Sequence, residues 1–215
     1  MKILFQGDSV TDCQRDRKDP QGLGGGYVRI IADALGAADM EFSAWNRGIS
    51  GNRVRDLVER WDEDCLDLKP NLLSILIGIN DVWRHFDRGL PIDHADVHRQ
   101  YRTLLERAAT QSPQLILMEP FLIPAAPEKV AFRPVLNPVI QIVRELAVEF
   151  GAALVPLDGL FAAACSWRPA GFWAEDGVHP TAAGHRLIAD AWLDVYQSLT
   201  SDEVRLTHFN HLSLS

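Results

Sequence analysis

Short apolar segments that alternate with longer stretches of helical periodicity constrain the fold of this chain more than any other feature. Five such segments occur, and each is five or six residues long and bounded by Gly, Pro or Asn. Short apolar runs between turn residues are typical of strands buried in a parallel sheet. The expected strands are residues 2–6, 41–46, 72–77, 114–119 and 152–156.

The stretches between these strands carry apolar residues at spacings of three and four, which predicts amphipathic helices. One stripe lies within residues 54–61, a second within 136–147 and a third within 187–195. Asn137 followed by Pro138 has the residue types of a helix N-cap and first helical position. The second helix is therefore expected to begin there, which would leave residues 120–134 mostly as loop.

Strand and helix in repeated alternation predict an α/β fold, because parallel strands need helical crossovers that cover both faces of the sheet. The expected architecture is a single three-layer α/β/α domain with a five-stranded parallel sheet, as in flavodoxin-like folds. The 215 residues and the apolar fraction of 47% suit one domain with a full core. The periodicity fades after residue 200, so we expect a domain over residues 1–200 and a C-terminal tail over 201–215.

Composition and charge exclude several classes of partner. No window approaches the roughly 20 apolar residues of a membrane span, and the N-terminal apolar run is too short for a signal peptide. The net charge is −8 with no basic block, which disfavours nucleic acid. The three cysteines are widely spaced and odd in number, as is typical of free thiols in a reducing compartment. We therefore expect a cytoplasmic protein with no nucleic-acid or membrane partner.

Polar residues follow the strands at the edge of the sheet where ligands bind in such folds, the carboxyl ends of the strands. They lie in four loops. Together these loops supply a hydroxyl nucleophile, amide donors, a carboxylate and an imidazole. The loops are residues 7–11, 46–52, 78–81 and 176–181.

Three side chains in these loops have the chemistry of a catalytic triad. The Ser9 hydroxyl is a weak nucleophile unless a neighbouring base accepts its proton. His179 is the only histidine in the four loops, and its ordinary pKa near 6.5 suits that role. Asp176 lies three residues earlier and can orient the imidazole. The expected triad is Ser9, His179 and Asp176.

Attack of a hydroxyl on an ester carbonyl creates an oxyanion that needs hydrogen-bond donors. The backbone N–H of Ser9 is a candidate because it begins a helix. The backbone N–H of Gly48 and the side-chain amide of Asn80 are the others. We expect these three groups to form the oxyanion hole.

The four loops also carry the motifs of a known family. The sequence GDSVT, a glycine in the second loop, GIND in the third and DGVHP in the fourth resemble the SGNH hydrolases, also called GDSL esterases, in the family's order. Val10 stands where the family name has leucine, which is an apolar replacement. The resemblance implies Ser9 as nucleophile and oxyanion donor, Gly48 and Asn80 as the other donors, and Asp176 with His179 as the rest of the triad.

A narrower resemblance concerns the substrate. The stretches WNRGISGNRVRDLVERW and KPNLLSILIGINDVW look like the branch of carbohydrate acetyl esterases that includes acetylxylan esterases. It implies a homo-oligomeric serine esterase that hydrolyses short-chain, chiefly acetyl, esters of a carbohydrate and needs no cofactor or metal. Expected substrate contacts are Asp8, Ile49, Trp83 and Trp173, the tryptophans as an apolar wall or sugar platform.

Several residues near the motifs have simpler expected roles. Asp8 could also cap the helix that follows it, and Asp81 is expected to support its loop through backbone hydrogen bonds. His185 lies within the last helical pattern and is expected to be structural or solvent-facing. The glycine cluster at residues 22–26 lacks the Lys-Ser or Lys-Thr of a phosphate loop and is read as a turn beside the site.

Other functions share parts of this pattern. A metal-dependent phosphoesterase could use Asp8, Asp81, Asp176 and His179 as ligands, and it would be sensitive to chelators. A non-catalytic carbohydrate-binding protein would show no activity on simple acetyl esters. A lysophospholipase or an acyl thioesterase would use the same triad, so that only the pocket separates it from an acetyl esterase.

Overall fold

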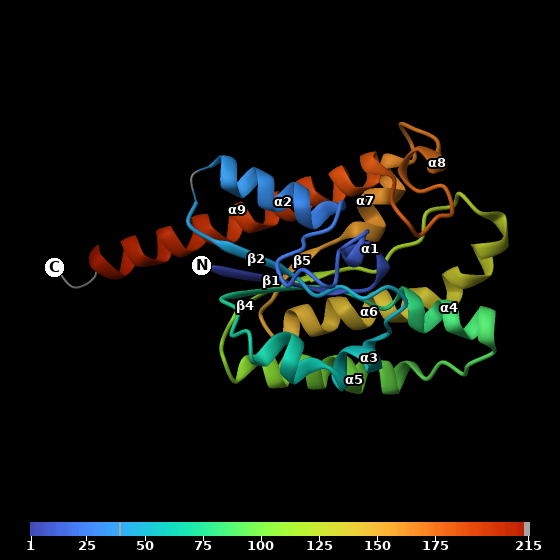
Figure 1. Cartoon of the computed structure of the whole chain (residues 1–215), viewed down its shortest axis with the longest axis horizontal. Helices are drawn as coiled ribbons and strands as arrows, with labels where there is room; N and C mark the ends of the chain where they lie inside the picture. Colours follow the sequence, from blue (N-terminus) through green and yellow to red (C-terminus); the bar gives the residue numbers. More distant parts are fainter. Residues whose placement is uncertain (39, 213–215) are drawn as a thin grey trace.

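Five parallel strands form one sheet at the centre of the molecule (Figure 1). The computed structural model describes residues 1–38 and 40–212, with side chains up to residue 201. The strand order is β2-β1-β3-β4-β5, and every neighbouring pair is parallel. The predicted α/β class and five-stranded parallel sheet are confirmed. The strands are β1 Lys2–Gly7, β2 Ser43–Asn46, β3 Leu72–Leu76, β4 Gln114–Met118 and β5 Ala153–Val155.

Helices cover both faces of this sheet, which gives the predicted three layers (Figure 1). The helices α2, α7 and α9 pack on one face, and α3, α5 and α6 pack on the opposite face. The helices are α1 Ser9–Asp12, α2 Tyr27–Ala37, α3 Val54–Glu59, α4 Ile79–Arg88, α5 His94–Ala109, α6 Arg133–Glu149, α7 Leu157–Ala164, α8 Ala170–Trp173 and α9 Ala182–Leu212, with a π-helical turn η1 Asp62–Leu66 and a 3₁₀ helix η2 Pro127–Phe132.

Side chains of β1 show why a continuous apolar run is needed in a central strand. Ile3, Leu4 and Phe5 are all fully buried. Successive side chains of a strand point to opposite faces, so Leu4 packs in one core while Ile3 and Phe5 pack in the other. Burial of each such side chain contributes about 1.5–3 kcal/mol. The strand is thereby fixed in the middle of the sheet, with its carboxyl end at Gly7.

The predicted start of the second helix at Asn137 is wrong. Helix α6 begins at Arg133, directly after η2, and Pro138 lies inside it. Pro134 occupies the first turn, where proline costs nothing because its missing N–H has no partner there. Pro138 forfeits one intrahelical hydrogen bond. The apolar stripe that continues through the buried Leu136 and Val139 holds the helix together past this point.

The C-terminal helix runs beyond the predicted end of the domain. Helix α9 begins at Ala182 and continues to Leu212, so that the chain keeps helical backbone after residue 200. The division into a domain over residues 1–200 and a tail remains a prediction. None of the helices in the described part of the chain is long and apolar enough to span a bilayer.

Candidate active site

Ser9 lies at the carboxyl end of β1, where the strand turns directly into helix α1. The Asp8 carboxylate caps this helix by accepting the Val10 N–H at 3.0 Å. The N–H of Ser9 is at the first helical position and has no partner within the helix. The sharp strand-to-helix turn therefore presents both the hydroxyl and the amide of Ser9 at the sheet edge.

The loop between α8 and α9 brings Asp176 and His179 to the same edge. Ser9 Oγ lies 3.0 Å from His179 Nε2, and His179 Nδ1 lies 2.8 Å from Asp176 Oδ2. The second carboxylate oxygen of Asp176 accepts the backbone N–H groups of Val178 at 2.9 Å and His179 at 2.8 Å. One carboxylate thus holds both the turn and the imidazole.

The contact with Asp176 determines which nitrogen of His179 carries the proton. An ionised carboxylate only accepts hydrogen bonds. Burial acts to raise the pKa of Asp176, but hydrogen bonds from His179, Val178 and Lys129 hold it below its usual range. Nδ1 of His179 therefore donates to Asp176, which leaves Nε2 free to accept the Ser9 proton. The same hydrogen bond raises the pKa of His179.

Lys129 is part of this site, although nothing in the sequence pattern singled it out. It lies in η2, 47 residues before Asp176 in the chain. Its Nζ donates to the backbone oxygen of Asp176 at 2.7 Å and lies 3.1 Å from Oδ2. The same Nζ is 4.1 Å from the ring centroid of Trp83. Only the tertiary fold reveals this contact, since a lysine in a Pro-rich segment carries no motif.

Asn80 lies in the first turn of α4 and is 4% exposed. Its Nδ2 donates one hydrogen bond to the backbone oxygen of Asn52 at 3.1 Å. An amide NH₂ group has two N–H donors, so one of them has no acceptor among the residues described with side chains. The contact also places Asn80 beside the loop that follows β2. The role of Asn80 as an oxyanion donor stays a prediction.

Gly48 does not fit its expected role. Its N–H donates to Asn46 Oδ1 at 2.8 Å, so it is not free to bind an oxyanion. A different requirement explains the glycine, because a Cβ at this position would lie 2.4 Å from the backbone nitrogen of Asp12. Gly48 thus permits the loop after β2 to pack closely against α1. The prediction that it is an oxyanion donor is corrected on this ground.

Gly51, three residues later, has the free amide that Gly48 lacks. Residues 49–52 form a turn closed by a hydrogen bond from the Asn52 N–H to the Ile49 carbonyl at 3.1 Å. Gly51 is the third residue of this turn with a φ of +84°, which a type II turn requires and which favours glycine. Within residues 1–38 and 40–201, the Gly51 N–H has no acceptor. Its neighbour Asn52 is the partner of Asn80.

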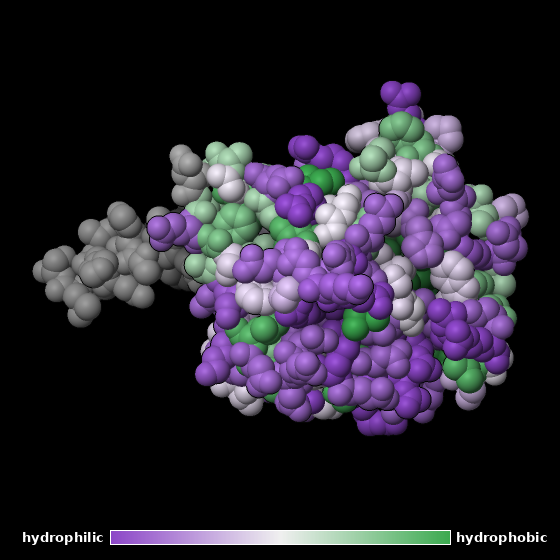
Figure 2. Space-filling view, viewed as in Figure 1, coloured by the Kyte–Doolittle hydropathy of each residue, from purple (hydrophilic) through white to green (hydrophobic). Residues whose placement is uncertain are grey.

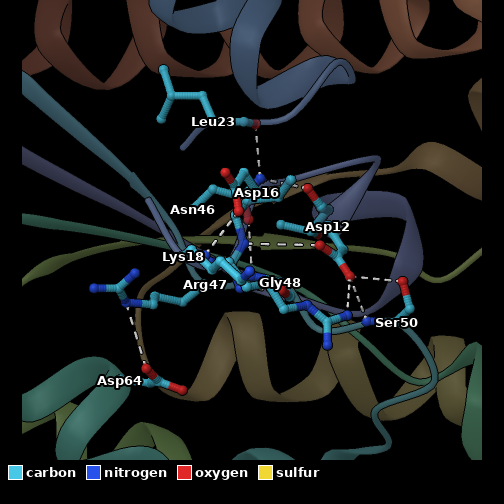
Figure 3. A network of polar contacts seen from close by, with 12 residues as sticks. Asp12, Asp16, Lys18, Leu23, Asn46, Arg47, Gly48, Ser50 and Asp64 are labelled. Atoms are coloured by element: carbon cyan, nitrogen blue, oxygen red, sulfur yellow. Dashed lines mark hydrogen bonds and ion pairs between the residues drawn. The ribbon is translucent and has the colours of Figure 1, made fainter. Parts of the chain in front are cut away.

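A buried polar network fixes the loop that carries Gly51 (Figure 3). Asp12 Oδ2 accepts the backbone N–H of Ser50 at 2.9 Å and its hydroxyl at 2.7 Å. The Asn46 side chain donates to the Thr11 carbonyl at 2.6 Å and to the Leu23 carbonyl at 2.9 Å. These bonds tie the end of β2 to α1, so the two loops share one rigid frame.

The four residues expected to contact the substrate differ in their burial and contacts. Asp8 is 1% exposed and its carboxylate caps α1, so it lies beneath the site and does not reach a substrate. Burial raises its pKa to about 7. Ile49, Trp83 and Trp173 are half-buried. Lys129 lies over the Trp83 ring, which restricts this tryptophan as a sugar platform. Trp173 comes directly before the bridge between Ala174 and Pro180 that closes the loop of His179.

The residues expected to be structural behave as predicted. Asp81 Oδ2 accepts the Val54 N–H at 3.1 Å and so supports the start of α3. His185 is 6% exposed; its Nδ1 accepts the Tyr27 N–H at 3.2 Å, and its Nε2 lies 3.2 Å from Cys13 Sγ. In the part of the chain described with side chains, no three His, Cys, Asp or Glu residues are grouped so that they could hold a metal ion.

The sequence profile of the GDSL-like lipase/acylhydrolase family matches residues 5–187. The chain belongs to this family. The matched segment contains all four loops of the site. An acetylxylan esterase from Geobacillus stearothermophilus is 36% identical over 210 residues, which cover 89% of this chain and 92% of that protein. The chain is therefore a carboxylic ester hydrolase of the GDSL family.

Solved structures of this family have the same fold as the present chain. A GDSL-like lipase from Parabacteroides merdae superposes with a TM-score of 0.86 at 39% identity, over 90% of this chain and 94% of its own. Axe2, the Geobacillus stearothermophilus acetylxylan esterase, superposes with a TM-score of 0.84 at 35% identity, over 90% and 93%. Three catalytic mutants of Axe2 replace a serine, an aspartate and a histidine with alanine, and that aspartate and histidine are three positions apart.

Proposed function

We propose that this GDSL-family esterase removes acetyl groups from a carbohydrate, with Ser9, His179 and Asp176 as its catalytic triad. The observation that carries the proposal is the unbroken chain of contacts from Ser9 Oγ through His179 to Asp176, at 3.0 and 2.8 Å. The catalytic mutants of Axe2 support it, because they concern the same three residue types with the same spacing of aspartate and histidine.

The proposed reaction follows the chemistry of acyl transfer. His179 Nε2 accepts the Ser9 proton as Oγ attacks the ester carbon, and the imidazolium then protonates the leaving sugar oxygen. Asp176 stabilises the imidazolium and keeps Nδ1 protonated. Water then attacks the carbonyl carbon of the acetyl-enzyme while His179 accepts its proton. His179 returns a proton to Ser9 Oγ as acetate leaves. Every proton that the reaction moves passes through one nitrogen.

We propose the N–H of Ser9, the N–H of Gly51 and the side chain of Asn80 as the oxyanion hole. Gly51 replaces Gly48 in this proposal because the Gly48 amide already donates to Asn46. Donors that are held before the reaction contribute most of the electrostatic stabilisation. The network around Asp12 and the contact of Asn80 with Asn52 supply that rigidity.

Asn80→Ala should lower kcat about 10²- to 10³-fold, which is the usual cost of one oxyanion donor, with a smaller change in KM. Steady-state kinetics with an aryl acetate measure both. Asn137→Ala on α6 is the matched control and should keep wild-type kinetics. A kcat unchanged in Asn80→Ala would assign Asn80 to structure alone.

The proposed substrate rests on the relatives and on the aromatic residues near the site. Variants of Axe2 are described as an acetyl-xylooligosaccharide esterase, and sugars stack on aromatic rings. Trp173 adjoins the catalytic loop. Further aromatic surface lies around α8, where hydrophobic residues gather at the upper right of Figure 2. Phe172 in α8 is 47% exposed, and Trp167, three residues before α8, is 81% exposed. A homo-oligomeric state and a cytoplasmic location stay predictions from the sequence.

Activity should fall steeply from acetyl to butyryl esters, and acetylated xylose or xylo-oligosaccharides should be deacetylated. A long acyl chain would gain about 0.8 kcal/mol of binding per buried methylene only if a groove received it. We expect an acyl site sized for acetyl, so longer chains should gain nothing and then clash. A panel of aryl esters from acetyl to dodecanoyl, together with acetylated xylosides, measures the preference. Efficiency highest for octanoyl or longer esters would indicate a lysophospholipase, and hydrolysis of acyl thioesters alone would indicate a thioesterase.

Trp173→Ala should weaken hydrolysis of the acetylated sugar several-fold more than that of the aryl acetate, because only the sugar needs a stacking surface. Trp167→Ala tests separately whether the exposed aromatic surface before α8 also contributes to sugar binding. Equal losses on both esters in Trp173→Ala would mean that the tryptophan supports the loop and does not bind sugar.

A further inference from the structure

We propose that Lys129 is a positioning residue, which fixes Asp176 and balances its charge so that His179 stays ready to accept the Ser9 proton. The proposal rests on the proposed function of the triad. It assigns to η2, an element outside the four motif loops, a direct part in controlling the catalytic base.

Lys129 holds Asp176 at two points. Its Nζ donates to the backbone oxygen at 2.7 Å and forms an ion pair with Oδ2 at 3.1 Å. Oδ2 is also the oxygen that accepts His179 Nδ1. Lysine and histidine therefore share one carboxylate oxygen from two directions. Rotation of the carboxylate would break both contacts, so Lys129 restricts the orientation that His179 needs.

Lys129 is buried, and its positive charge is stabilised by specific partners. Lys129 is 8% exposed, and lysine is rarely buried unless it is paired. The Trp83 ring lies 4.1 Å from Nζ and contributes a cation–π interaction. Trp83 in turn lies 5.7 Å from the His179 ring, centroid to centroid. The ammonium is thus held between the acid of the triad and a ring that also touches its base.

The charges around His179 explain what this ammonium does. The hydrogen bond and charge of Asp176, together with the charge of Asp8, raise the pKa of His179, while burial and the positive charge of Lys129 lower it. His185 on α9 is near enough to His179 for an electrostatic interaction, but burial lowers its pKa to about 4, so it is neutral at ordinary pH. Without Lys129, only burial would oppose the carboxylates that raise the pKa of His179.

The consequence is a specific effect on the pH dependence of the enzyme. The neutral form of His179 is the base, so activity rises with pH as the imidazolium loses its proton. Lys129 disfavours the imidazolium and therefore lowers the pH at which activity begins. Removal of the positive charge should raise the pKa of His179 and move the acid limb of the profile toward higher pH.

The experiment compares Lys129→Met, Lys129→Arg and the wild type. Methionine keeps an unbranched stem against Trp83 without the charge, while arginine keeps the charge. The Lys129 stem also borders a cavity of about 330 Å³, which leaves room for either side chain. Lys69→Met is the matched control. It changes the net charge equally, but Lys69 lies on the exposed turn just before β3, at the amino ends of the strands and away from the site.

The measurement is kcat and KM for an aryl acetate across the pH range. In Lys129→Met we expect an acid limb shifted to higher pH and a kcat about tenfold lower at its plateau, because a hydrogen bond to a charged group is lost, with little change in KM. Lys129→Arg should restore the position of the acid limb, and Lys69→Met should match the wild type throughout.

Two results would overturn the proposal. The first is an acid limb of Lys129→Met that coincides with that of the wild type. A fall in kcat without a shift of this limb would be a structural effect. The second is a shift of equal size in Lys129→Arg. If Lys129→Met does not fold, Lys129→Gln carries the same comparison, because it keeps a donor for the backbone oxygen of Asp176.

The test separates this proposal from the proposed triad. An organophosphate that reacts with Ser9 in the wild type, together with acetyl esterase activity, supports the triad whatever Lys129 does. A wild type that lacks both would contradict the proposed function itself. An active wild type whose pH profile does not depend on Lys129 contradicts only the role of this lysine.

Discussion

Ser9→Ala should lower kcat about 10⁶-fold, the loss that follows removal of the nucleophile of a serine hydrolase. Alanine cannot form the acyl-enzyme, and His179 Nε2 loses the hydroxyl that lies 3.0 Å away. The fold should not change, because within the residues described with side chains Ser9 Oγ has His179 as its single partner, and Asp8 rather than Ser9 caps α1. Steady-state kinetics with an aryl acetate give the loss, and thermal unfolding tests the fold.

Covalent labelling gives the sharper form of this test. An organophosphate should modify the wild type at Ser9 alone, as shown by mass spectrometry of peptides, and should leave Ser9→Ala unlabelled. Ser198→Ala is the control, since Ser198 is an exposed residue of α9 that donates only to the Asp194 carbonyl. Label on Cys13 or on another serine would contradict the assignment of the nucleophile.

Most of the fold followed from the sequence because buried parallel strands leave a clear signal. A central strand needs apolar residues on both faces, and the run from Ile3 to Phe5 has them. The location of the site followed from the same fact. The carboxyl ends of parallel strands lie at the same end of the sheet. The loops after β1 and β3 must therefore lie close together, although Ser9 and Asn80 are 71 residues apart in the chain.

The predictions that did not hold depended on backbone detail and on tertiary packing. The loop of residues 46–52 contains both Gly48 and Gly51, and only its backbone conformation shows which of the two N–H groups is free to bind an oxyanion. The positive φ of Gly51 and the acceptor Asn46 beside Gly48 decide between them. The start of α6 was misplaced because Pro138 is tolerated inside a helix whose apolar face is buried.

Lys129 illustrates a further limit of sequence reasoning. Its contact with Asp176 joins η2 to a loop 47 residues away, and neither segment shows a pattern that depends on the other. Asp8 is the reverse case, since its place in the first motif suggested substrate contact while the structure buries it as a helix cap. In both, what a polar side chain does is determined by its neighbours in space.

Asp176→Asn should lower kcat about 10⁴-fold, as expected when the orienting carboxylate of a triad becomes an amide. Asp176 Oδ1 accepts the N–H groups of Val178 and His179, so an asparagine would keep its oxygen there. Its NH₂ would then face His179 Nδ1 and the ammonium of Lys129, donor against donor. The imidazole would respond by moving its proton to Nε2.

That exchange of tautomer is the reason for the large loss. With a proton on Nε2, His179 donates toward Ser9 and cannot accept the hydroxyl proton, although every atom of the site stays near its place. KM should therefore change little while kcat falls. Kinetics with an aryl acetate measure both constants, and Asp190→Asn is the control because this half-exposed carboxylate lies on α9 and pairs with Arg186. A loss of less than tenfold in Asp176→Asn would mean that Asp176 only holds the turn and that another group orients the base.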